Sequence, residues 1–182
     1  MIITPITDEL IPELELFCKT AKRLGYTNNA SLKLMRYDWC KENGEYFCAI
    51  KHHKIIAVAG CHTLPQLHDS AWRILFRGCE LPGKSPYKGL NKGDWNSITQ
   101  RDFIPEFINY CPTKDLYIST NISNEHSGKA LRNHRLMGIL ANQKDAYLNY
   151  ICDMELFNCE QTIWQLNIGK YLERRSKLNG LV

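Results

Sequence analysis

The chain has 182 residues, of which 44% are hydrophobic and 23% charged, a composition that excludes disordered and fibrous proteins and fits one domain with a single core. Its net charge of +4 permits an anionic partner such as a nucleotide cofactor or a nucleic acid without requiring one. Nowhere do about 18 apolar residues occur in a row, and no basic segment precedes an apolar run at the N-terminus. We therefore expect a cytoplasmic protein without a membrane span.

The N-terminal half of the sequence alternates short apolar runs with helical patterns. Apolar residues recur every three or four positions after Thr7 or Asp8, either of which can cap a helix that Gly25 ends. A second helix is expected to start near Asn29 or Ser31 and to stop at Gly44. The expected strands are residues 2–6, 46–50, 55–61 and 72–80, with residues 51–54 as the turn of a hairpin.

The C-terminal half begins with a polar, glycine-rich stretch at residues 82–95, a length of loop that is usually functional. A helix is expected from about Arg101 to before Pro112, and another at residues 127–140. The expected strands are residues 116–120, 147–154 and 161–166. The charged end at residues 170–177 is either a solvated coil or a short helix.

The eight cysteines form no C-x-x-C pair, and none has zinc-finger spacing to a histidine. We expect them to be reduced thiols that pack as small hydrophobes, and we expect no metal site.

Residues 127–139 form the most informative segment, because they follow a strand and read as an amphipathic helix. Their spacing, with Ser127, Ala130, His134, Gly138 and Ile139, resembles the Asn-x-x-Ala-x-x-x-Tyr-x-x-x-Gly-Phe segment of GNAT acetyltransferases. The order of the expected elements is similar to the GNAT fold over nearly the whole chain, and the hairpin ends in a glycine, as it does in that family.

The resemblance implies a single GNAT-like domain over residues 1–182, with a core at about 1–168 and a short charged tail. Its fold class would be α/β (α+β): a mixed, mainly antiparallel sheet of six to seven strands flanked by about four helices. It also implies that the parallel strands 72–80 and 116–120 splay apart, so that the pantetheine arm of acetyl-CoA lies between them.

In the family, the pyrophosphate sits on a glycine-rich loop at a helix N-terminus, where backbone N–H groups are unpaired. The nearest match here is residues 87–93, whose lysines and glycines either cradle the phosphates or form a solvated surface turn. The positions that the resemblance assigns to the cofactor are Cys79, Leu81, Lys88, Gly89, Lys92, Gly93, Asn121, Asn124 and Ser127. For Asn124 and Ser127, capping of the helix is the alternative.

Acetyl transfer to an amine requires a base for the ammonium proton and an acid for the departing thiolate. By resemblance, Glu80 is the candidate base, the alternative being a hydrogen-bonded carboxylate at a strand end. His134 occupies the position of the family's proton-donating tyrosine, and histidine can donate a proton near neutral pH. A helix-face histidine with a structural partner is the alternative. Tyr117 and Asn121 flank the expected wedge and could contact substrate, and Trp72 is a further candidate for contacting substrate.

The resemblance therefore predicts an acyl-CoA-dependent N-acyltransferase that acts on a small-molecule or macromolecular amine. Two other interpretations stay open. The chain also resembles, more loosely, small GNAT-like proteins of bacteriophages, and in the phage Mom group this fold modifies adenine in DNA. The second interpretation is therefore a Mom-like enzyme that modifies DNA. The arginines, Arg73 among them, and the aromatic residues interleaved with them suit contact with a nucleic acid. Such a protein would act in the host cytoplasm. The third interpretation is a non-catalytic binding module.

Overall fold

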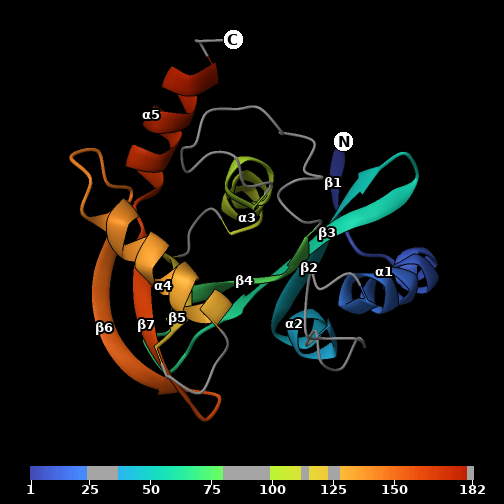
Figure 1. Ribbon diagram of the computed structural model, residues 1–182, viewed down its shortest axis with the longest axis horizontal. Coiled ribbons are helices and arrows are strands. Elements are labelled where there is room, and N and C mark those ends of the chain that lie inside the picture. The colour runs from blue at the N-terminus through green and yellow to red at the C-terminus, as the bar shows by residue number, and fades with distance from the viewer. Residues whose placement is uncertain (24–36, 80–98, 112–114, 123–127, 180–182) are drawn as a thin grey trace. The chain divides into compact units, whose positions relative to one another are not determined.

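The computed structural model describes residues 1–23, 37–79, 99–111, 115–122 and 128–179 (Figure 1). The described residues form seven strands and five α-helices, with a 3-10 turn at Asp8–Leu10 and a π-helical turn at Thr99–Phe103. In chain order the elements are β1 (Ile2–Pro5), α1 (Ile11–Arg23), α2 (Tyr37–Asn43), β2 (Gly44–Lys51), β3 (Lys54–Thr63), β4 (Ala71–Cys79), α3 (Ile104–Tyr110), β5 (Asp115–Asn121), α4 (Gly128–Ala141), β6 (Leu148–Leu156), β7 (Cys159–Leu166) and α5 (Ile168–Asn179).

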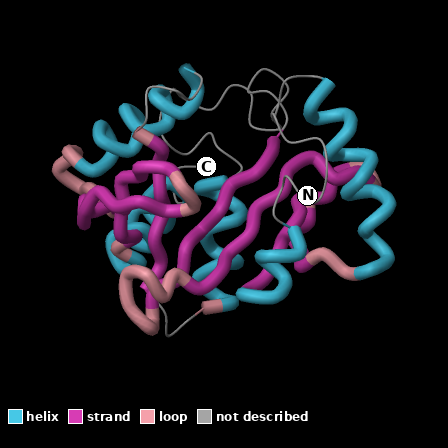
Figure 2. The backbone as a smooth tube through the Cα atoms, turned by 90° about the horizontal axis from the view of Figure 1, so that it is seen from below, coloured by secondary structure: helices cyan, strands magenta, loops and turns pink. Residues whose placement is uncertain are grey.

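The strands form one mixed sheet in the order β1-β2-β3-β4-β5-β7-β6. Figure 2 draws these strands in magenta. The pairs β1–β2, β2–β3, β5–β7 and β6–β7 are antiparallel. The expected mixed, mainly antiparallel sheet is therefore confirmed. The chain divides into two compact units, which we call the first unit (Met1–Thr63 and Ile74–Pro112) and the second unit (Leu64–Arg73 and Thr113–Val182).

In the first unit, both faces of β2 are buried because successive side chains point to opposite sides of the strand. Tyr46 and Cys48 belong to the hydrophobic cluster that also contains residues of α1 and α2. Phe47, on the other face, packs edge-on against Phe107 and Tyr110 of α3, with ring centroids 5.4 and 5.8 Å apart. A strand covered on both faces reads as a continuous apolar run, which is why this one was predictable.

The hairpin of β2 and β3 turns at His52 and His53, whose φ values are 51° and 60°. A two-residue turn of this kind needs two left-handed residues, because only then does its twist match that of the strands. The turn between β6 and β7 likewise consists of two left-handed residues, Phe157 and Asn158, with φ values of 55° and 59°. Both turns therefore use residues other than the preferred Asn-Gly.

In the second unit, β5, β7 and β6 present one face to α4, which contacts β5 and β6 (Figure 1). Thr120 and Trp164 lie on this face, since both contact His134 of α4. The opposite face carries a core cluster that includes Tyr117, Ile163 and Leu156. The register, with Thr120 opposite Thr162 and Ser119 opposite Ile163, accounts for this division.

The charged end, for which the sequence left coil or short helix open, is the helix α5. Its Tyr171 is fully buried and packs edge-on against Tyr147, with ring centroids 5.7 Å apart. Arg174 lies over the Tyr147 ring and donates a hydrogen bond of 2.8 Å to Gln143. These contacts anchor the helix, so the solvated-coil alternative is wrong.

Seven of the eight cysteines have described side chains; these seven are free thiols, and five of them are buried: Cys18, Cys40, Cys48, Cys61 and Cys111. Burial raises the pKa of Cys18 to about 11 and that of Cys48 to about 12. Hydrogen bonding to Cys111 and burial both raise the pKa of Cys61. As expected, these five thiols pack as small hydrophobes.

None of the described helices is both long enough and apolar enough to cross a lipid bilayer.

Candidate active site

Five of the predicted site residues lie in described elements. His134 is on α4, Tyr117 and Asn121 are on β5, Trp72 is on β4, and Cys79 is the last residue of β4. The other predicted positions lie outside the described residues: Glu80, Leu81, Lys88, Gly89, Lys92, Gly93, Asn124 and Ser127. Their roles stay predictions.

His134 contacts two buried side chains of the sheet. Its Nδ1 lies 3.2 Å from Oγ1 of Thr120, and its ring centroid lies 6.0 Å from that of Trp164. Trp164 donates its indole N–H to the same Thr120 oxygen at 2.8 Å. Thr120 and Trp164 are only 6% and 5% exposed. The imidazole is therefore held by partners on two neighbouring strands.

The Thr120 hydroxyl can serve His134 in either protonation state. A hydroxyl has one proton and two lone pairs, and the indole N–H, which can only donate, occupies one lone pair. The hydroxyl proton can then be donated to Nδ1 of a neutral imidazole. The second lone pair can accept an N–H from Nδ1 of an imidazolium. The arrangement thus leaves Nε2 as the nitrogen that can exchange a proton with another molecule.

Sequence reasoning did not find Thr120 and Trp164 as site residues. Thr120 is 14 residues from His134, and Trp164 is 44 residues from Thr120. The one signal available was chemical, because a buried tryptophan N–H needs an acceptor. The strand pattern alone gave no indication of which acceptor it would find.

Tyr117, a predicted substrate contact, belongs to a hydrogen-bond chain of the second unit. Ser70 donates to a carboxylate oxygen of Asp115 at 3.3 Å, and its oxygen can accept from His68 Nδ1, 3.1 Å away. In a neutral imidazole with this tautomer, His68 Nε2 is the acceptor for the Tyr117 hydroxyl, 2.8 Å away. Burial, followed by the charge of Asp115, raises the pKa of Tyr117, which keeps the phenol a donor.

Arg73 does not belong to a basic surface, contrary to the sequence-based suggestion. It is only 6% exposed, and it donates to Ser119 Oγ at 2.8 Å and to Gln161 Oε1 at 2.9 Å. Its guanidinium also lies over the Phe157 ring, 5.2 Å from the centroid. Acceptors on β5 and β7 and an aromatic face therefore draw this charge into the interior of the second unit.

The first residues of β4 run parallel to β5 within the second unit. The carbonyl of Ser70 accepts the backbone N–H of Asp115 at 3.2 Å, and Arg73 contacts Ser119 further along. Both contacts advance in the same chain direction, which is the mark of parallel neighbours. The two strands therefore have the parallel direction that was expected, whereas the splaying of one from the other stays a prediction.

Trp72 and Asn121, the other predicted contacts, are both half-buried. Asn121 ends β5 opposite Gln161 of β7.

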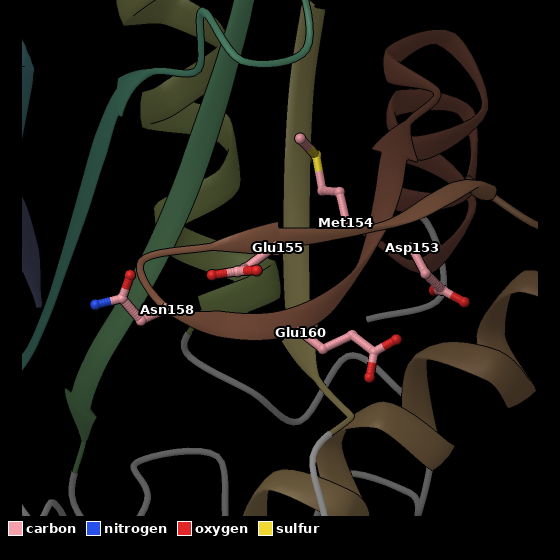
Figure 3. A pocket seen from close by; sticks show the side chains of 5 residues that line it. All are labelled: Asp153, Met154, Glu155, Asn158 and Glu160. Carbon is pink, nitrogen blue, oxygen red and sulfur yellow. The ribbon is translucent and has the colours of Figure 1, made fainter.

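A cavity of about 470 Å³ lies at the end of the β6–β7 hairpin (Figure 3). Its lining residues are Asp153, Met154, Glu155, Asn158 and Glu160. Glu155 and Glu160 are directly opposite each other in the strand register. Like charges in such a pair repel, so the lining is unsuited to an anionic group such as a pyrophosphate.

No protein-family model and no curated protein sequence matches the chain. Solved structures do resemble it. An acetyltransferase of Desulfovibrio desulfuricans assigned to the GNAT family aligns with a TM-score of 0.56 and 11% identity, over 91% of this chain and 97% of that one. The chain has the GNAT fold.

Two further solved structures share this GNAT fold. An aminoglycoside 6'-N-acetyltransferase complexed with coenzyme A aligns with a TM-score of 0.51 and 10% identity, over 91% of this chain and 96% of that one. A spermidine N-acetyltransferase, a chimera of the Vibrio cholerae protein and hSSAT, gives a TM-score of 0.51 and 11% identity over 96% and 100% of the two chains. The GNAT architecture thus extends over nearly the full length of each chain.

Proposed function

We propose that the protein is a cytoplasmic, acyl-CoA-dependent N-acyltransferase that transfers an acetyl group to an amine. The observation that carries the proposal is the placement of His134. It lies on α4 of a GNAT fold, at the position that resembles the family's proton-donating tyrosine, and its ring is held by the buried Thr120 and Trp164. An imidazole fixed through Nδ1 is suited to donate a proton from Nε2.

The reaction forms an amide bond and breaks a thioester. Acetyl-CoA would supply the acyl group as an activated thioester, and one of the GNAT-fold structures is a complex with coenzyme A. In this proposal Glu80 removes the proton of the acceptor ammonium, and the imidazolium of His134 gives its Nε2 proton to the departing sulfur. The ammonium loses two protons in all as it becomes the amide nitrogen, the thiolate gains one, and the net reaction releases the other to solvent, so the protons balance.

The proposed cofactor site follows the resemblance. The segment of residues 87–93, with Lys88, Gly89, Lys92 and Gly93, would offer cations and close backbone approach to the pyrophosphate. The remainder of the proposed cofactor site would be lined by Cys79, Leu81, Asn121, Asn124 and Ser127.

Binding of acetyl-CoA, followed by turnover, tests the proposal. Isothermal titration with acetyl-CoA is expected to show one site, and release of free CoA thiol is then followed with a panel of amines. The panel includes an aminoglycoside and spermidine, because two of the proteins with this fold are named for acetylating them. A peptide with a free N-terminus is added for macromolecular acceptors. No binding at several hundred micromolar acetyl-CoA would contradict the proposal.

Substitution of His134 tests its assigned role. His134→Ala is expected to retain acetyl-CoA binding while kcat falls about 10²- to 10⁴-fold, the usual contribution of a general acid. His53→Ala is the matched control, since His53 lies in the turn between β2 and β3. Equal kcat values for the His134 variant and the wild type would remove His134 from the mechanism.

A further inference from the structure

We propose that Thr120 and Trp164 are positioning residues, which together fix the tautomer and the orientation of the His134 imidazole and leave Nε2 as its proton-donating nitrogen. The inference rests on the proposed function of His134 as the acid. It adds two residues from two strands to the machinery of that reaction. Neither touches the reacting atoms; both act through the histidine.

The three polar groups have one arrangement that satisfies each of them. Trp164 can only donate, and its N–H points to Thr120 Oγ1 at 2.8 Å. If the hydroxyl donates to Nδ1 of a neutral His134, 3.2 Å away, every group has a partner. If Nδ1 carried the proton instead, two N–H groups would face the same oxygen, and the hydroxyl proton would have no acceptor among these atoms. The neutral ring is therefore expected to carry its proton on Nε2.

The burial of Thr120 and Trp164 strengthens the preference of the neutral ring for the Nε2–H tautomer. Thr120 and Trp164 are 6% and 5% exposed, so water is a poor substitute for a missing partner at either group. Among the residues that the structure describes, Thr120 is the hydrogen-bond partner of the imidazole. Trp164 also limits the ring's tilt, with the two ring planes 53° apart. The direction of the Nε2–H bond is thus set by the sheet, not by α4 alone.

The same oxygen accommodates the proton transfer. In the imidazolium, the Nδ1–H bond points to the second lone pair of Thr120 Oγ1. When the Nε2–H bond breaks and the proton forms an S–H bond with the leaving thiolate, the ring is first left neutral with its proton on Nδ1, the less favoured tautomer. Reprotonation at Nε2 restores the imidazolium, and loss of its Nδ1 proton returns the ring to the Nε2–H form that it has at rest. The ring need not turn at any step, because Thr120 partners Nδ1 throughout.

Nitrogen-15 NMR of the histidine side chains tests the inference without reference to activity, since it reports which ring nitrogen carries the proton. In the wild type at a pH where His134 is neutral, the Nε2–H tautomer is expected to predominate. Thr120→Val keeps the shape of the side chain but removes the hydroxyl, and Trp164→Phe removes the indole donor. Both variants are expected to lower the population of that tautomer, whereas Thr120→Ser is expected to restore it.

Thr162→Val is the matched control. Thr162 is an equally buried threonine, directly opposite Thr120 in the sheet, but its hydroxyl donates to Asp153 at 2.7 Å. This variant is expected to leave the His134 tautomer unchanged. A wild-type ring with its proton on Nδ1, or a Thr120→Val spectrum identical to that of the wild type, would overturn the inference.

Kinetics supply the second arm of the test. Thr120→Val is expected to lower kcat about 10- to 100-fold, part of the 10²- to 10⁴-fold contribution of a general acid, with the KM for acetyl-CoA unchanged. Rescue by Thr120→Ser excludes a fold defect. The two proposals fail separately: a protein that does not bind acetyl-CoA contradicts the function, whereas an unaltered tautomer in Thr120→Val contradicts the positioning.

Discussion

The close approach of Gly60 to its neighbours predicts that Gly60→Ala destabilises the first unit. A Cβ at this position would lie 2.8 Å from Sγ of Cys40 and 2.8 Å from Cδ2 of Tyr46. Non-bonded carbon atoms are best placed about 3.5–4.0 Å apart, so the methyl group would be roughly 1 Å too close to each. Neither neighbour can yield, because Cys40 and Tyr46 are fully buried and Tyr37 packs edge-on against the Tyr46 ring.

Gly138 is the matched control for this substitution. A Cβ there would meet nothing within 4 Å, and the residue lies inside helix α4. Both Gly→Ala changes reduce the entropy of the unfolded chain, which is worth about 0.4–1 kcal/mol. At Gly60, overpacking of about 1–3 kcal/mol opposes this gain. We therefore expect the free energy of unfolding to fall by about 1–2 kcal/mol for Gly60→Ala and to rise by about 0.5–1 kcal/mol for Gly138→Ala.

Thermal and urea unfolding, followed by circular dichroism, measure the difference. For a chain of 182 residues, 1 kcal/mol corresponds to a change in Tm of about 2–4 °C. Gly60→Ala is thus expected to lower Tm by about 2–8 °C, and Gly138→Ala to raise it by about 1–4 °C. Shifts of the same sign in both variants would refute the steric argument. An added Cys40→Ala change should recover part of the loss in Gly60→Ala.

Three further predictions concern single side chains. Glu160→Lys replaces a like-charged cross-strand pair with Glu155 by an attractive one, and it is expected to raise the free energy of unfolding by about 0.2–1 kcal/mol at low salt, with a smaller gain in 1 M salt. His53→Gly removes the steric cost of a left-handed backbone conformation in the β2–β3 turn, so the free energy of unfolding is expected to rise by up to about 1 kcal/mol. An unchanged urea midpoint would contradict this expectation. Burial raises the pKa of the Cys48 thiol from 9.0 to about 12, so above pH 9 the unfolded chain loses a proton that the folded protein keeps. Stability is therefore expected to fall between pH 9 and about 12, with a smaller slope in Cys48→Ala.

Much of the fold was predictable because its signals are local. The strands β2 and β3 are apolar on both faces, and a polar dipeptide turn separates them, which defines a hairpin within about 20 residues. The helix predicted at residues 127–140 is α4, Gly128–Ala141. Each of these elements can be recognised from residues within its own span.

The parts that were not predictable depend on distant partners. Arg73 is buried because its acceptors, Ser119 and Gln161, lie 46 and 88 residues further along the chain. The same holds for α5, whose charged sequence suggests solvent; Tyr147 of the second unit holds Tyr171 in place. A charged residue is predicted to be exposed unless its hydrogen-bond acceptors are known. A single sequence does not show which distant residues will supply those acceptors.

The candidate site illustrates both cases. The spacing of residues 127–139 predicted that His134 lies on a helix following β5, and the structure places it there. Its two partners were missed because Thr120 and Trp164 sit among strand residues whose pattern predicts only burial. Residue type is informative here in retrospect: a threonine and a tryptophan, unlike valine and phenylalanine, bring a hydroxyl and an N–H into the interior.

Two hydrogen bonds between buried polar side chains and their partners lie on the α4-facing side of the second unit. Trp164 donates to Thr120, and Thr162 donates to Asp153 at 2.7 Å, so two neighbouring threonines have different partners. An apolar surface would be the simpler way to pack a helix on a sheet, because buried polar atoms cost free energy unless each is partnered. Departures from local rules that are fully compensated by partners are typical of functional positions. This distinguishes the contact of His134 with Thr120 from ordinary helix packing, and it is why Thr120→Val, not Thr162→Val, is expected to alter the histidine.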